Sequence, residues 1–339
     1  MKLLVIGPSW VGDMVMAQAL FISLRQRYPG CSIDVLAPDW CRALLQRMPE
    51  VRAALPLPLA HGELALGKRW RLGRRLRAGA YDQAIVLPNS FKSALIPCFA
   101  GIPLRTGWRG EARGWLLNDC RRLDKNAFPL MVQRFVALAS PPGAVLPAPL
   151  PWPALRADTV AAAAARQRLG LLAQKPVAAL CPGAEFGPAK QWPARHHAQV
   201  AQTLVQRGWQ VWLLGSARDA AVATAILQHM EPAAREHCHD LCGRTELGEA
   251  VDLLGETALV LSNDSGLMHI AAALARPLVV TYGSTSAAFT PPLAARVRQL
   301  TLGLPCSPCF KRECPLQHLD CLEKLEPARV LAAIDELLE

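Results

Sequence analysis

Residues 182–190 combine two glycines with a lysine that could bind an anion. They read PGAEFGPAK and follow a short apolar run at residues 177–180. Glycine lets a backbone approach an anionic group closely, and a mobile ammonium can reach a phosphate or diphosphate. We therefore take Lys190 as a candidate phosphate ligand. An ordinary exposed lysine is the alternative.

Residues 7–13 form a second loop of this kind, with a carboxylate at its end. They read GPSWVGD and precede a predicted helix. The spacing is similar to that of a phosphate-binding P-loop, but Asp13 replaces the P-loop lysine and would repel phosphate. Near the positive end of a helix an ionised Asp13 could instead accept a proton from a hydroxyl group. A helix-capping aspartate is the alternative.

Residues 262–269 join a predicted strand to a predicted helix. They read SNDSGLMH, and residues 282–286 add further hydroxyl groups after the next strand. Small residues at a helix start leave backbone N–H groups available, and these can bind an anion together with the helix dipole. Asp264 or Ser265 as an ordinary N-cap, and His269 as an interior histidine, are the alternatives.

Four cysteines near the C-terminus have a spacing that could bind a metal. Cys306, Cys309, Cys314 and Cys321 follow the pattern C-x2-C-x4-C-x6-C. Four thiolates can form a tetrahedral site for structural zinc or iron. Reduced cysteines that bind nothing are the alternative. The total of 11 cysteines is odd and several lie in apolar segments, so we expect no disulfide framework.

Positive charge is concentrated in the first half of the chain. Residues 1–156 hold 21 basic and 9 acidic side chains, a net charge of +12, whereas residues 157–339 have a net charge of −2. The densest basic run is residues 68–77. This asymmetry predicts an anionic partner: nucleic acid, an anionic membrane surface or an acidic substrate. No helix-turn-helix, zinc-finger or RNA-stacking motif accompanies it, so we expect no nucleic acid.

Apolar runs alternate with segments of helical spacing, which favours parallel sheets covered by helices. Six prolines among the thirteen residues 141–153 exclude a helix or central strand there and predict a linker. We therefore expect two doubly wound α/β domains whose facing loops form one cleft. The predicted strands are residues 3–6, 32–36, 83–87, 177–180, 210–214, 258–262 and 278–281, and the predicted helices are residues 14–28, 40–48, 159–169, 194–207, 218–229, 247–254 and 266–274.

No stretch reaches the about 18 consecutive apolar residues that cross a membrane as a helix. The apolar run at residues 3–6 leads directly into Gly7 and Pro8, unlike a signal peptide. We therefore expect a cytoplasmic protein.

Taken in order, these motifs resemble glycosyltransferase family 9, the ADP-heptose:lipopolysaccharide heptosyltransferases. The resemblance extends over nearly the whole chain. It is carried by residues 7–13 (GPSWVGD), 87–93 (LPNSFKS), 105–110 (RTGWRG), 182–190 (PGAEFGPAK), 263–269 (NDSGLMH), 282–285 (YGST) and 306–321 (CSPCFKRECPLQHLDC).

The resemblance implies a GT-B fold, with an acceptor-binding domain at residues 1–156 and a nucleotide-sugar domain at residues 157–326. A C-terminal helix at residues 327–338 is expected to fold back onto the first domain. The implied reaction is inverting, metal-independent transfer of L-glycero-D-manno-heptose from ADP-heptose to the first heptose of the lipopolysaccharide inner core, on Kdo2-lipid A. The implied location is peripheral, on the cytoplasmic face of the inner membrane, and we expect a monomer.

The resemblance also assigns roles to residues. It implies Asp13 as the catalytic base and Lys190 as the ligand of the donor phosphates. The implied donor-binding residues are Gly183, Glu185, Phe186, Asp219, Thr245, Asp264, Ser265, Gly266 and His269. The implied acceptor-binding residues are Gly12, Asn89, Lys92, Arg105, Arg109 and Arg113. Two features depart from the related enzymes that transfer the first heptose: Glu185 and Phe186 replace paired threonines, and Ala217 replaces a ribose-binding glutamate, for which Asp219 is the substitute.

Three other functions compete with this one. Heptose could be transferred directly onto Kdo. A nucleotide-sugar 2-epimerase of similar architecture would need no acceptor surface, so the basic first domain argues against it. A non-catalytic carbohydrate- or lipid-binding protein would leave the loops around Lys190 and Asp264 without a purpose. The chain also has no Asp-x-Asp triplet, in agreement with departure of the diphosphate without a metal.

Overall fold

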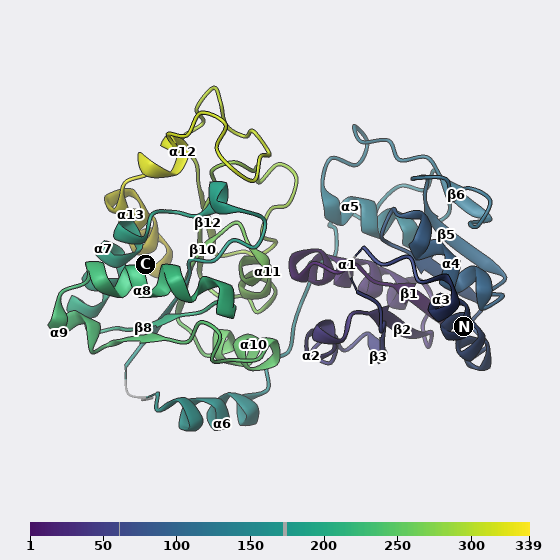
Figure 1. Cartoon of the computed structure of the whole chain (residues 1–339), viewed down its shortest axis with the longest axis horizontal. Coiled ribbons are helices and arrows are strands. Elements are labelled where there is room, and N and C mark those ends of the chain that lie inside the picture. Colours follow the sequence, from purple (N-terminus) through teal and green to yellow (C-terminus); the bar gives the residue numbers. More distant parts are fainter. Residues whose placement is uncertain (61, 172–174) are drawn as a thin grey trace. The chain divides into compact units, whose positions relative to one another are not determined.

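The computed structural model describes residues 1–60, 62–171 and 175–339, which form two compact units (Figure 1). The units are Met1–Pro153 and Ala154–Glu339, so the boundary falls at the end of the proline-rich linker rather than after residue 156. Prolines there fix the backbone and remove N–H donors, which keeps the linker out of both sheets.

The first unit contains a sheet of six parallel strands in the order β3-β2-β1-β4-β5-β6. Its central strands are almost entirely buried and apolar, as expected for a parallel sheet covered by helices on both faces. The strand order reverses between the neighbouring strands β1 and β4. From β1 to β3 the strands are added toward one edge of the sheet, and from β4 to β6 toward the other. The strands are β1 Lys2–Ile6, β2 Ser32–Ala37, β3 Val51–Pro56, β4 Gln83–Val86, β5 Leu104–Trp108 and β6 Asp119–Arg121.

Helices connect these strands. The longest, α1, follows the loop at residues 7–10 and packs against α5. The helix predicted at residues 40–48 is a 3-10 turn, η1, followed by the short helix α2. The helical elements are α1 Val11–Arg27, η1 Asp39–Cys41, α2 Arg42–Leu45, α3 Leu66–Leu76, η2 Arg77–Gly79, α4 Phe91–Phe99, α5 Met131–Val136 and η3 Ala137–Ala139.

The second unit repeats this strand order with β12-β11-β10-β7-β8-β9. Its first strand, β7, pairs with its fourth, β10, so the same reversal occurs between them. Ligands of such sheets bind beyond the carboxyl ends of the strands at this reversal. The strands are β7 Val177–Cys181, β8 Gln210–Leu213, β9 Cys238–Asp240, β10 Leu259–Asn263, β11 Leu278–Thr281 and β12 Val297–Leu300.

The helices of the second unit have recognisable ends. In α6 the Asp158 carboxylate accepts hydrogen bonds from the Val160 and Ala161 amides, and Gly170 ends the helix with a φ of 69°. The helical elements are α6 Thr159–Leu169, η4 Pro188–Lys190, α7 Ala194–Gln206, η5 Ala217–Asp219, α8 Ala220–His229, α9 Pro232–Arg235, α10 Leu247–Gly255, α11 Gly266–Ala273, α12 Asp320–Glu323 and α13 Pro327–Leu338.

The C-terminal helix α13 packs within the second unit, against α7, β11 and β12. Val330, Ile334 and Leu337 recur at helical spacing and are buried in that unit's core. The expectation that this helix folds back onto the first domain is therefore wrong. Its apolar face packs into the hydrophobic core of its own unit, beside the sheet.

Within the described part of the chain, no helix has both the length and the apolar character required to span a bilayer.

Candidate active site

Three loops of the second unit meet at the carboxylate of Asp264. The Lys190 ammonium, at the end of η4, lies 2.7 Å from Oδ2 of Asp264, which directly follows β10. Thr285, after β11, donates its hydroxyl hydrogen to the same oxygen over 2.5 Å. The loops meet because β7, β10 and β11 are adjacent parallel strands and all three end at the same edge of the sheet.

The ion pair between Lys190 and Asp264 is shielded from water. Their side chains are 14% and 6% exposed. Shielding strengthens the attraction, but it also makes either charge costly if the other is lost. Both predicted residues are therefore held in one place on the loops of the second sheet.

His269 lies in α11 with a buried side chain. Burial lowers its pKa to about 4; the nearby Asp264 carboxylate opposes this shift and Lys190 adds to it. The imidazole is therefore neutral at neutral pH. The predicted N-cap position is correct for Ser265, but its side chain forms no capping hydrogen bond to the helix. The first-turn amides of α11 are thus not capped by that hydroxyl, which suits anion binding.

Asn263 holds this arrangement together and was not among the predicted site residues. Its Nδ2 donates to the carbonyl oxygen of Pro182 over 2.6 Å. Its Oδ1 accepts from the Trp192 amide at 3.2 Å and from the Thr281 hydroxyl at 3.1 Å. A polar residue just after an apolar run is the signal in the sequence that could have identified it; in the structure its side chain is fully buried and hydrogen-bonded.

Gly183 lies against the side chain of Asp219; their predicted role in donor binding stays a prediction. A Cβ atom at Gly183 would lie 2.5 Å from the carboxyl group of Asp219, so a larger residue there would displace that carboxyl group. The Asp219 carboxylate accepts hydrogen bonds from the Ser216 amide and hydroxyl at 2.8 and 2.9 Å. Glu185, another predicted donor residue, forms an ion pair with Arg218, the residue before Asp219. Thr245, also predicted, lies in the segment that follows β9.

In the first unit, Asp13 lies in the first turn of α1. Trp10 is the N-cap residue, so Asp13 is not the cap, and it remains partly exposed. The helix starts directly after the loop that follows β1, at the edge of the sheet where Asn89 and Lys92 follow β4. Gly12, Asn89 and Lys92 are also at least partly exposed at that edge.

Arg113 does not present its charge at the surface. It is fully buried, and burial lowers the pKa of its guanidinium. It donates hydrogen bonds to the Trp108 carbonyl at 2.5 Å, to Oδ1 of Asn89 at 2.9 Å and to the Pro88 carbonyl. The prediction that Arg113 contacts the acceptor is corrected: the loop wraps around it, and it positions Asn89.

The other two predicted arginines differ from each other. Arg105 donates to the carbonyl oxygens of Leu116 and Ile102 at 2.7 and 2.6 Å, so its guanidinium supports the backbone. The side chain of Arg109 is exposed. Among the three predicted arginines, Arg109 is thus the one whose charge lies at the surface.

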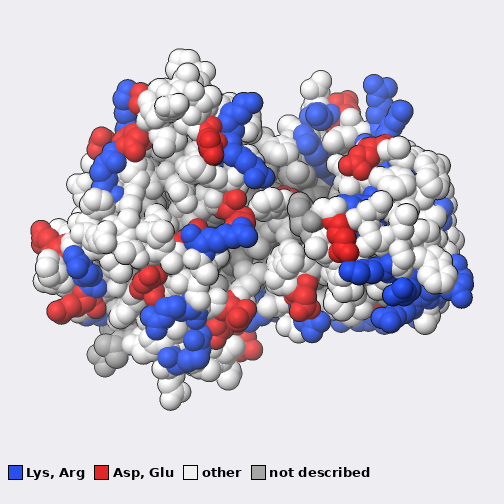
Figure 2. Space-filling view, in the orientation of Figure 1, with Lys and Arg blue, Asp and Glu red and all other residues white. Residues whose placement is uncertain are grey.

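The basic run at residues 68–77 forms α3 and the turn after it. Lys and Arg side chains gather over this helix (Figure 2). Arg69 is the exception, since it is buried and donates to the carbonyl oxygens of Leu64, Glu63 and Lys92. The exposed basic residues are Lys68, Arg71, Arg74, Arg75 and Arg77.

The thiols of the four C-terminal cysteines lie near one another. Burial raises the pKa of Cys321, and the neighbouring thiols of Cys306, Cys314 and Cys309 raise it further. Across residues 1–60, 62–171 and 175–339, however, no three Cys, His, Asp or Glu side chains are placed as a metal ion requires. The zinc or iron site stays a prediction, which metal analysis of the purified protein would test.

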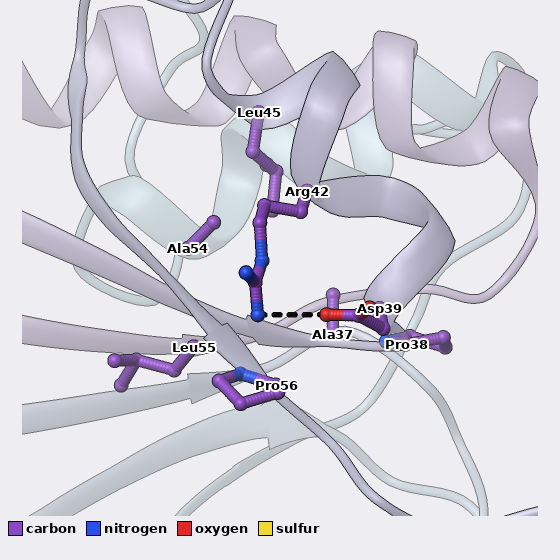
Figure 3. Close-up of a pocket in the computed structure, with 8 residues that line it drawn as sticks. All are labelled: Ala37, Pro38, Asp39, Arg42, Leu45, Ala54, Leu55 and Pro56. Atoms are coloured by element: carbon purple, nitrogen blue, oxygen red, sulfur yellow. Dashed lines mark ion pairs between the residues drawn. The ribbon is translucent and has the colours of Figure 1, made fainter. Parts of the chain in front are cut away.

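One hollow in the first unit lies away from these residues. It opens beside β2 and β3, and Arg42 reaches across it to Asp39 at 2.8 Å (Figure 3). None of the predicted site residues lines it. The loops described above, rather than this hollow, form the candidate active site.

The buried histidines make stability depend on pH. Burial lowers the pKa of His197 to about 3 and that of His269 to about 4, whereas the unfolded chain titrates near 6.5. The unfolded chain therefore binds more protons below pH 6.5, and the free energy of unfolding should decrease between about pH 6.5 and pH 4. Denaturant titrations across this range measure how steeply the free energy of unfolding changes with pH.

A His269→Asn variant should show a smaller dependence on pH, while the exposed control His229→Asn should keep it. Equal pH dependence in the unaltered protein and both variants would contradict the prediction.

Known proteins are similar to this chain over most of its length. A model of glycosyltransferase family 9 (heptosyltransferase) matches residues 69–320. The chain is 49% identical to lipopolysaccharide heptosyltransferase 2 of Escherichia coli strain K12, over 100% of this chain and 99% of that protein. It is 50% identical to lipooligosaccharide heptosyltransferase 2 of Haemophilus influenzae, over 89% of each chain.

The fold agrees with these similarities. A solved structure of Escherichia coli ADP-heptose LPS heptosyltransferase II matches with a TM-score of 0.91 and 48% identity, covering 100% of this chain and 98% of that one. Together with two parallel six-stranded sheets of the same strand order, this confirms the predicted GT-B fold. The chain belongs to glycosyltransferase family 9, the heptosyltransferase family.

Proposed function

We propose that this protein transfers heptose from ADP-heptose to the inner core of lipopolysaccharide, with the first heptose of heptosyl-Kdo2-lipid A as the acceptor. The observation that carries the proposal is the shielded contact of Lys190 with Asp264 at the reversal of the second sheet. A cation and uncapped helix amides there suit a nucleotide diphosphate. The similarity to lipopolysaccharide heptosyltransferase 2 and lipooligosaccharide heptosyltransferase 2 supports the choice of acceptor.

The reaction is a single displacement at the anomeric carbon. As the acceptor oxygen forms its bond to that carbon, Asp13 takes the proton from the acceptor hydroxyl. The bond from the anomeric carbon to the diphosphate oxygen breaks, and its electron pair leaves with ADP. Lys190 and the first-turn amides of α11 stabilise the charge that develops on the departing diphosphate. One displacement inverts the configuration of the sugar.

The proposal is tested by incubating the protein with ADP-heptose and acceptors that carry zero, one or two heptoses. Mass spectrometry should show one heptose added to the acceptor that already carries one. Addition only to the acceptor without heptose would instead indicate transfer onto Kdo. A changed sugar nucleotide in the absence of any acceptor would indicate an epimerase.

We further propose that the basic first unit attracts the phosphates and carboxylates of this acceptor at the cytoplasmic face of the inner membrane. The exposed cations of α3 and the net charge of +12 over residues 1–156 support it.

Binding of the whole protein to vesicles that contain anionic lipid should therefore weaken as the salt concentration rises, because salt screens exposed charges. Sedimentation of vesicles at several ionic strengths measures this. Changing Arg71 and Arg74 to alanine should lower binding at low salt. The same change at Arg207, an exposed arginine of the second unit, and Arg298, a half-exposed one, is the control. Binding that is independent of salt would contradict the electrostatic explanation.

A further inference from the structure

The cysteine-rich segment of residues 303–319 is attached to the loops of the proposed donor site. It contains neither helix nor strand, yet it is tied to two of these loops. The hydrogen bonds run from the Ser307 hydroxyl to the Gly283 carbonyl at 2.6 Å, from the Phe310 amide to the Ser284 carbonyl at 2.7 Å, and from the Ala189 amide to the Arg312 carbonyl at 3.0 Å. The backbone at Arg312 therefore has a defined position beside Lys190.

Gly187 allows this close approach. A Cβ atom at Gly187 would lie 2.5 Å from the carbonyl oxygen of Arg312 and 3.0 Å from its Cα atom. Any other residue at this position would push the two backbones apart, because both contacts are with main-chain atoms. The sequence of the loop thus accommodates the segment that carries Arg312.

Two cationic groups share the aromatic ring of Phe186. The Lys190 ammonium lies 5.0 Å from the ring centre, and the guanidinium carbon of Arg312 lies 5.5 Å from it. An aromatic face attracts a cation and restrains its position. Two like charges around one ring also repel each other. The arrangement therefore concentrates positive charge at the loop.

The carboxylates nearby do not balance this charge. Lys190 is paired with Asp264, and Arg218 is paired with Glu185. In the three described stretches of the chain, Arg312 forms no ion pair with a carboxylate. It is thus a cation at the donor loop whose charge is not neutralised by the protein.

We propose that Arg312 binds the diphosphate of the nucleotide sugar together with Lys190. This rests on the proposed function. The diphosphate carries negative charge before transfer and gains more when its bond to the sugar breaks. The ion pair of Lys190 with Asp264 has no net charge, so Arg312 supplies the positive charge that is still needed. A planar guanidinium can also hold two phosphate oxygens at once.

Arg312→Ala should weaken ADP binding about tenfold or more, since it removes a hydrogen bond between two charged groups. The KM for ADP-heptose should rise with it. Binding of adenosine, which lacks phosphate, should stay unchanged, as measured by calorimetry. Arg312→Lys should restore part of the ADP affinity. Gly187→Ala should weaken ADP binding as well, because it displaces the backbone of Arg312.

Lys311→Ala is the matched control, since it removes a neighbouring exposed cation from the same segment and should leave ADP affinity unchanged. Equal ADP affinity in Arg312→Ala and Lys311→Ala would overturn the proposal. An equal loss for ADP and adenosine would overturn it too, because Arg312 would then act through the structure of the loop. If the unaltered protein neither binds ADP nor transfers heptose, the proposed function itself fails first.

Discussion

Replacing Asp13 with asparagine should reduce turnover by about 100-fold or more, because loss of a general base typically costs 10²- to 10⁴-fold in rate. Asparagine has nearly the same size, so the first turn of α1 should keep its structure. The amide cannot accept the proton of the acceptor hydroxyl at neutral pH. The affinity for ADP should remain the same, since the proposed donor loops belong to the second unit. Single-turnover rates and ADP calorimetry on the same sample measure both effects.

Asp39→Asn is the matched control for this variant. Asp39 is an exposed carboxylate that follows β2 of the same sheet and pairs with Arg42. An exposed pair of this kind contributes little to stability, so its loss should change neither turnover nor folding. Near-normal turnover of the Asp13→Asn protein would remove Asp13 from the role of base.

Lys190→Ala should have the second large effect, and it should act on both donor affinity and rate. The substitution removes the ammonium and leaves the Asp264 carboxylate shielded from water without its cation. That carboxylate would then repel the diphosphate. Loss of one charged hydrogen bond corresponds to about 1.5–3 kcal/mol, or roughly 10- to 100-fold in affinity. ADP calorimetry and the dependence of rate on ADP-heptose concentration measure the change.

A second substitution separates binding from stability. Breaking a buried ion pair by removing one partner also costs about 3–5 kcal/mol of stability. Adding Asp264→Asn to Lys190→Ala removes the uncompensated charge and should recover part of this stability, but not the ADP affinity. Lys324→Ala, which breaks an exposed pair with Asp320, is the control. If the double variant binds ADP as the unaltered protein does, Lys190 does not bind the diphosphate.

Local signals allowed much of the second unit to be predicted from the sequence. Helix α6 was predicted at its observed bounds because a capping aspartate and a terminal glycine mark its ends. The loops after β7 and β10 were identified because small and charged residues follow buried apolar runs there. Strands β3, β5, β6, β9 and β12 were not predicted; of these, β6 and β9 have only three residues each, too few to show a pattern.

Contacts between distant residues were not predictable in the same way. Helix α13 was expected at its observed residues but on the wrong unit, because its apolar stripe does not specify which groove it will enter. Arg113 was expected at the surface, yet the loop folds around it. Its guanidinium donates hydrogen bonds to five neighbouring residues. Arg312 lies more than a hundred residues from Phe186 in the sequence, so only the fold brings them together.

The shared strand order of the two sheets gives their loops a one-to-one equivalence. The loop that carries Asp13 follows the first strand of its sheet, as the loop that carries Lys190 does in the other. Asn89 and Asp264 likewise follow the fourth strands. In the proposed reaction, proton removal and leaving-group departure would thus fall on corresponding loops of two sheets with the same strand order. Under the proposed function, such a division would let evolution exchange the unit that selects the recipient while the unit that handles the activated sugar stays as it is.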